Sequence, residues 1–165
     1  MDRRLREHME ATYFAEYQVL RNELLDILVD DDLAYRPGAT AFSLGELCRE
    51  IGEIEHSYVE AFRTFQQDVD WRNSDPRIER SVEALKEWYA DLDRRLADAL
   101  EALTEDEVAS RRVTRHDFDV EAFSPLPPQE LDIYREALLI FYGKVSVYLR
   151  TIGKHLPGHW QAWIG

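Results

Sequence analysis

The chain is short of several features, and each shortage excludes a class of protein. It has one cysteine in 165 residues, Cys48, which rules out an internal disulfide framework. No apolar run reaches the roughly 20 residues that a membrane-spanning helix needs. The charged opening, MDRRLREHME, lacks the apolar stretch of a secretory signal. We therefore expect a cytoplasmic protein with no membrane contact.

Positive charge is also scarce. The chain has 20 Lys and Arg against 33 Asp and Glu, a net charge of −13. Nucleic-acid binding needs clustered Lys and Arg, whereas the arginine pairs here lie among acids, so we expect no nucleic-acid partner. Apolar residues make up 45% and charged residues 32%, which is typical of a globular protein. The length predicts one domain over residues 1–165.

Four stretches have the apolar spacing of amphipathic helices: residues 3–29, 43–70, 78–103 and 129–152. Ser43 and Glu46 form a capping-box pattern at the start of the second, and Gly153 follows the last. Residues 104–128 lack this spacing, and the prolines at their end exclude a helix there until residue 129. The sequence therefore predicts an all-α, up-down four-helix bundle with a long irregular crossover before the last helix.

Two stretches carry a resemblance to a known family. SLGELCREIGEIEHSY, from Ser43, and YREALLIFYGKVSVYLRTIGKHLP, from Tyr134, resemble the DinB/YfiT-like family of small four-helix proteins. Members of that family usually hold a divalent metal such as zinc or nickel with three histidines. The positions that match those histidines are Glu50, Ala137 and Phe141, so the resemblance implies the fold but not the usual metal site.

The histidines are missing from both helices that should supply them. The predicted helix 129–152 contains none, and His56 lies about 180° around the helix from Leu47, on the side away from the core. Alanine and phenylalanine have no lone pair to donate, and one carboxylate would hold zinc or nickel weakly. We therefore expect no metal cofactor.

Glu50 is the sharpest candidate for chemistry. It lies about 60° from Leu47, at the edge of the apolar face, where a carboxylate is a candidate general base. The alternative, which we favour, is a structural carboxylate that bonds to Arg21 or to a tyrosine such as Tyr134, because buried charges need partners. Arg21 lies about 40° from Tyr17, on the inward side of the first predicted helix.

The bundle interior allows two interpretations. Ala137 and Phe141 are core filler, or they form the floor of a small pocket. Polar tips around such a pocket would come from Arg21, Tyr17 and Tyr134, with further tyrosines at 13, 58 and 142. In the tail, Trp160 and Trp163 either cover the end of the bundle or pack on a second subunit, and family members often form homodimers.

The resemblance implies a stress- or detoxification-related protein. The family includes thiol-dependent S-transferases that use low-molecular-weight thiols. The first hypothesis is a relative with a degenerate metal site that binds a small molecule in the bundle interior. The second is an active thiol-dependent transferase or hydrolase that uses Glu50 or a relocated metal. The third is a non-catalytic, dimeric structural or partner-binding bundle.

Overall fold

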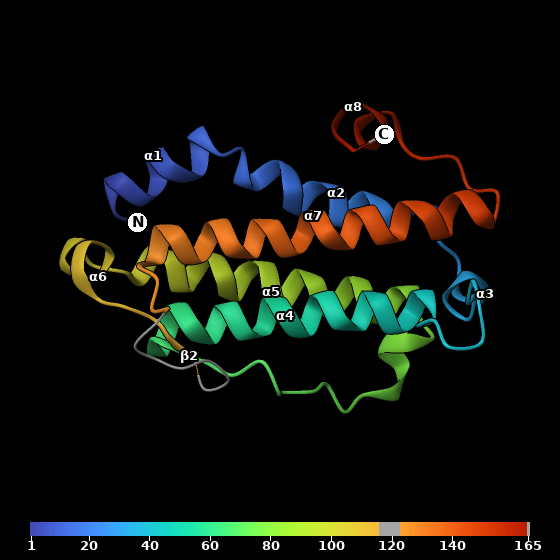
Figure 1. The fold of residues 1–165 in the computed structure, drawn as a ribbon, viewed down its shortest axis with the longest axis horizontal. Helices are drawn as coiled ribbons and strands as arrows, with labels where there is room; N and C mark the ends of the chain where they lie inside the picture. The colour runs from blue at the N-terminus through green and yellow to red at the C-terminus, as the bar shows by residue number, and fades with distance from the viewer. Residues whose placement is uncertain (116–122, 165) are drawn as a thin grey trace.

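Helices make up almost all the regular structure in the computed structural model, which describes residues 1–115 and 123–164. In that part of the chain four helices exceed ten residues: α2 Phe14–Ile27, α4 Leu44–Thr64, α5 Val82–Ala102 and α7 Pro127–Thr151. The shorter helices are α1 Arg3–Ala11, α3 Asp30–Leu33, the 3-10 turn η1 Pro76–Glu79, α6 Glu105–Ser110 and α8 Gly158–Trp163. The all-α prediction is confirmed (Figure 1).

The long helices lie side by side around one apolar core, but they do not alternate in direction. Helix α4 packs against α5 and α7, and α2 packs against the same two helices (Figure 1). Gly45 at the start of α4 touches Glu79, just before α5, so these two helices begin at the same end and run parallel. Helix α7 runs the other way: Tyr148 near its end donates to the Phe42 carbonyl just before α4, whereas Tyr134 near its start packs on Tyr58 near the end of α4. The predicted up-down order is therefore replaced by two parallel pairs, with a second long connection over residues 65–81.

The first predicted helix is in fact two helices. Tyr13 adopts the left-handed conformation, with φ of 53°, and this ends α1 and starts α2. Left-handed backbone is unfavourable for a residue with a Cβ, so tertiary packing outweighs the local preference here. The break allows Leu5 and Phe14 both to be buried. Tyr13, predicted on the inward side, is instead 61% exposed.

The helix ends follow the sequence signals more closely. The Ser43 hydroxyl accepts a hydrogen bond from the Glu46 amide at 3.1 Å, and the Ser43 amide donates to Glu46 Oε2 at 2.6 Å. Gly153 has a φ of +75° just past α7, as predicted. Helix α7 begins two residues earlier than predicted, at Pro127, because proline is tolerated in the first turn of a helix. Helix α4 ends at Thr64, not near residue 70.

The crossover before α7 contains α6 and a short strand, β2 Thr114–Arg115. This strand pairs in parallel with β1 Gln66–Gln67, which follows α4. Residues 116–122 of the predicted irregular crossover lie outside the described residues.

The tail folds back as a short helix, α8, which begins at Gly158 with Pro157 as its N-cap. Trp160 is fully buried, and its Nε1–H donates to the Leu20 carbonyl at 2.8 Å. Trp160 therefore packs on its own chain. Of the helices described, none is both long and apolar enough to cross a membrane.

Candidate functional site

The three positions that match the family's metal ligands come together in space. Glu50 on α4 and Ala137 and Phe141 on α7 line one hollow of about 120 Å³ between the two helices. The wall is completed by Ile51 and Ile54 on α4 and by Ile140 and Lys144 on α7. We call this the α4–α7 hollow. It lies at the edge of the bundle, since Ile140 is exposed while Phe141 is buried in the core.

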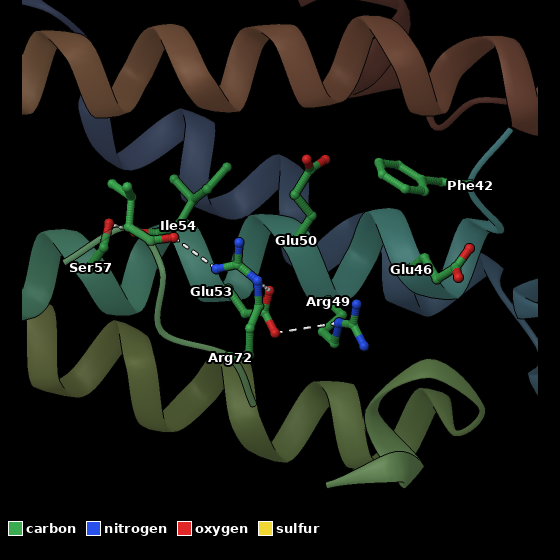
Figure 2. A pocket seen from close by; sticks show the side chains of 9 residues that line it. Phe42, Glu46, Arg49, Glu50, Glu53, Ile54, Ser57 and Arg72 are labelled. Atoms are coloured by element: carbon green, nitrogen blue, oxygen red, sulfur yellow. Dashed lines mark hydrogen bonds and ion pairs between the residues drawn. The ribbon is translucent and has the colours of Figure 1, made fainter. Parts of the chain in front are cut away.

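Glu50 has a different partner from those predicted. Its side chain is 41% exposed and reaches from α4 toward α7, where Lys144 Nζ lies 3.6 Å from Oε2 (Figure 2). The prediction that Glu50 is a buried carboxylate paired with Arg21 or a tyrosine is therefore wrong. Glu50 does lie at the edge of the apolar face of α4, as predicted. From that edge its long side chain extends into solvent instead of into the core.

The donor set of the hollow does not fit a divalent metal. Ala137 and Phe141 offer no lone pair, and the one carboxylate, Glu50, is already paired with an ammonium group. A tetrahedral site needs three protein ligands besides an open position. Over residues 1–115 and 123–164, no group of three or more His, Cys, Asp or Glu side chains could hold a metal ion.

A second pocket adjoins the hollow on the outer side of α4 and shares Glu50 and Ile54 with it. Its volume is about 230 Å³, and Figure 2 shows its lining around α4 and the segment that follows β1. We call it the arginine pocket. Its lining residues are Phe42, Glu46, Arg49, Glu50, Glu53, Ile54, Ser57, Val69 and Arg72.

Glu53 organises one side of the arginine pocket. Its nearly buried carboxylate accepts the Asn73 amide at 2.9 Å, lies 3.3 Å from Arg49 Nε and lies 3.7 Å from Arg72 Nε. Arg49 also pairs with Glu79. This carboxylate therefore ties the segment after β1 to α4 and fixes two guanidinium groups at the pocket.

The opposite side of the pocket carries carboxylates. Glu46 pairs with Arg36, with Nη1 2.8 Å from Oε2. The backbone hydrogen bond from Ser43, followed by the bond from Arg36, lowers the pKa of Glu46, so this group is ionised at neutral pH. With Glu50 beside it and the exposed ring of Phe42 between, the pocket offers cations, anions and apolar surface within one small volume (Figure 2).

Sequence reasoning missed Arg49, Glu53 and Arg72. Arg49 and Glu53 have the i, i+4 spacing of a helical ion pair, which is a common feature of exposed helix faces and so carries little functional signal. Arg72 lies in an irregular segment, and its position beside α4 depends on the bend of the chain after β1. No pattern in the sequence predicts this bend.

Arg21 is fully buried, as predicted, but in a different environment. It pairs with Glu55, which is also fully buried, and with Asp93 at 2.8 Å. The guanidinium lies over the Tyr89 ring, 4.2 Å from its centroid. Arg21 is thus the centre of an internal charge cluster that joins α2, α4 and α5. It lines neither the α4–α7 hollow nor the arginine pocket.

The predicted tyrosine tips also make internal contacts. The Tyr142 hydroxyl donates to the carbonyl of Tyr17, and Tyr58 stacks on Tyr134 with centroids 4.8 Å apart. Tyr134 is fully buried, and its hydroxyl has no hydrogen-bond partner among the described residues. Burial raises the pKa of Tyr134 well above its usual value. Neither Tyr17 nor Tyr134 lines the α4–α7 hollow or the arginine pocket.

Two other reactive side chains are accounted for by their surroundings. His56 faces away from the core, as predicted, and stacks on Trp71 with centroids 3.7 Å apart. Partial burial, followed by the nearby Arg95 charge, lowers the pKa of His56.

Cys48 is fully buried, and burial raises its pKa to about 12. A protonated, inaccessible thiol is a small hydrophobe and not a nucleophile.

The fold has a close match among solved structures. The chain is similar to the crystal structure of a DinB-like protein of Bacillus subtilis, YjoA, with a TM-score of 0.68. The sequences are 20% identical, and the match covers 90% of this chain and 95% of that one. No family model matches the sequence, and no curated protein matches it. At this identity the likeness shows the fold, so the chain has the DinB-like fold that the resemblance predicted.

Proposed function

We propose that this protein is a member of the DinB-like family that has lost the metal site and binds a small zwitterionic molecule in the arginine pocket. One observation carries the proposal. The place where the family would hold its metal carries a paired carboxylate, a methyl group and a phenyl ring, while the adjoining pocket presents charges of both signs.

The charges of the pocket select the ligand class. Arg72 is more than half exposed; its Nη1 donates to the Val69 and Trp71 carbonyls and its Nε lies 3.7 Å from Glu53, so Nη2 is the group that would meet a ligand carboxylate. On the other side, Glu46 and Glu50 contact Arg36 and Lys144 through Oε2, so Oε1 of each carboxylate would accept from a ligand ammonium group. A volume of about 230 Å³ falls below the roughly 300–1,000 Å³ of pockets for drug-sized ligands. The ligand is therefore an amino acid or a short peptide-like molecule, a class that includes low-molecular-weight thiols.

An active thiol transferase has less support. Glu50 is half exposed and paired with Lys144, so it lacks the desolvated surroundings in which a carboxylate becomes a strong general base. Cys48 is buried and protonated. Binding without turnover fits the described residues better than catalysis through either group.

Titration calorimetry tests the proposal with cysteine, serine and glutathione. We expect at least one of these zwitterions to bind, and Arg72→Gln to weaken that binding by roughly tenfold, because it removes a charge-assisted hydrogen bond. Arg80→Gln is the matched control, since Arg80 is an exposed arginine outside the pocket. Its affinity should equal that of the unmodified chain.

Two results would overturn the proposal. One is the absence of binding by any of the three compounds at 10 mM. The other is a stoichiometric divalent metal in the purified protein that is lost on Glu50→Gln, which would show that the metal site persists. Turnover of a thiol substrate that depends on Glu50 would replace binding with catalysis as the function.

A further inference from the structure

The outward face of α7 carries an apolar stripe where a solvated helix would carry polar residues. Leu139, Ile140 and Val147 are 39%, 61% and 58% exposed. Gly143 lies between them, and no described atom comes within 4 Å of the place where its Cβ would be. The stripe consists of Glu136, Leu139, Ile140, Gly143, Val147 and Arg150, all exposed.

The spacing of this stripe suits helix pairing. Glu136, Gly143 and Arg150 follow one another at intervals of seven residues, which places Glu136 and Arg150 about 20° to either side of Gly143 around the helix. Ile140 and Val147 lie on one flank of that line and Leu139 on the other. Gly143 at the centre allows a second helix to approach closely, since small residues bring helix axes together.

We propose that this face is a two-fold interface at which α7 of a second copy of this chain packs antiparallel, with the two Gly143 residues at the axis. In this arrangement a residue n positions before Gly143 meets one n positions after it. Glu136 then faces Arg150 of the second copy, about 10.5 Å from the axis, and the same pair recurs on the other side. The charges of the stripe are thus complementary to themselves.

The net charge of the chain favours this face over others. Two copies at −13 each repel one another over most of their surfaces. On the stripe, Glu136 and Arg150 cancel, and neither has an ion pair with another residue in the described ranges. The stripe is about 21 Å long, so it is smaller than the roughly 800 Å² per partner of standard interfaces. We therefore expect a dimer that dissociates at micromolar concentrations.

Sedimentation velocity between 1 and 200 µM tests the interface. The unmodified chain should shift from monomer to dimer over this range, and Val147→Glu should remain a monomer throughout. Val19→Glu is the control, because Val19 is an exposed valine on α2 and its substitution should leave the dimer intact. A monomeric unmodified chain at 200 µM overturns the proposal, as does a Val147→Glu dimer.

Charge reversal tests the antiparallel register. Glu136→Arg and Arg150→Glu should each weaken dimerisation by roughly tenfold, because each places like charges together on both sides of the axis. The double variant restores opposite charges and should recover the original dissociation constant. Failure of the double variant to recover, when both single variants are weakened, overturns the antiparallel pairing.

Cross-linking provides a second measurement of the same geometry. Gly143→Cys should form an oxidised dimer, because the two residues meet at the axis, and buried Cys48 does not compete. Thr151→Cys, eight residues from the axis, should not cross-link within the dimer. Equal cross-linking of both variants would mean that the contacts are random collisions or that another face is used, and would overturn the proposal.

Discussion

Removing Arg21 from its buried cluster should be far more damaging than removing its exposed partner. Arg21 and Glu55 are both fully buried, whereas the Asp93 side chain is 26% exposed. Arg21→Met would leave the Glu55 carboxylate in the core without a counter-charge, which costs about 3–5 kcal/mol in comparable sites. Asp93→Asn removes only a partly solvated ion pair, worth about 1 kcal/mol or less.

The double variant Arg21→Met, Glu55→Met gives the sharpest test. Replacing a buried ion pair by apolar side chains of similar size is often neutral, so the double variant should be more stable than Arg21→Met alone. Glu55→Met by itself should lower the free energy of unfolding by about 1–3 kcal/mol, because Arg21 still has its ion pair with Asp93. The two single effects therefore exceed the double effect by at least about 2 kcal/mol.

Urea unfolding at pH 7, followed by far-UV circular dichroism, measures these free energies. A typical domain has about 5–15 kcal/mol of stability, so Arg21→Met should unfold at a much lower urea concentration, or be partly unfolded without urea. Additive single effects would refute the reasoning, because they would mean that Arg21 and Glu55 contribute independently. Equal costs for Arg21→Met and Asp93→Asn would refute it as well.

The remaining predictions concern a close backbone contact and the thiol. Gly45→Ala would place a Cβ 2.1 Å from the Glu79 carbonyl oxygen, and the resulting shift of backbone should lower the free energy of unfolding by about 1–3 kcal/mol. Gly143→Ala is the control for Gly45→Ala, and both are measured by urea unfolding at a concentration where the chain is monomeric. The free energy of unfolding of Gly143→Ala should rise by about 0.5–1 kcal/mol, because the added Cβ meets open space. Because burial raises the pKa of Cys48 to about 12, iodoacetamide at pH 8.5 should modify the native chain roughly a thousandfold more slowly than the urea-unfolded chain. Mass spectrometry measures the two rates, and equal rates would contradict the burial of this thiol.

Local patterns in the sequence predicted local structure well. Ser43 and Glu46 form the expected capping box because both partners lie within one turn of helix. The family resemblance matched Glu50, Ala137 and Phe141 to the metal-ligand positions, and these three residues line one hollow in the structure.

Features that depend on contacts between distant residues were not predictable. No glycine or proline marks the break at Tyr13, which results from packing of α1 and α2. Glu55 has no local sign of burial, because its partner Arg21 lies on another helix. Glu50 and Glu55 are five residues apart on α4, and only the positions of α2 and α7 decide which carboxylate is internal.

The docking of α8 has a consequence for the order in which the chain can fold during synthesis. Helix α2 is made early, yet its contacts include Tyr142 with the Tyr17 carbonyl and Trp160 with the Leu20 carbonyl. These partners emerge from the ribosome more than 120 residues after the groups they bind. A nascent chain that already contains α1 to α5 therefore leaves one side of α2 uncovered, and that side remains open to chaperones until the last helices appear.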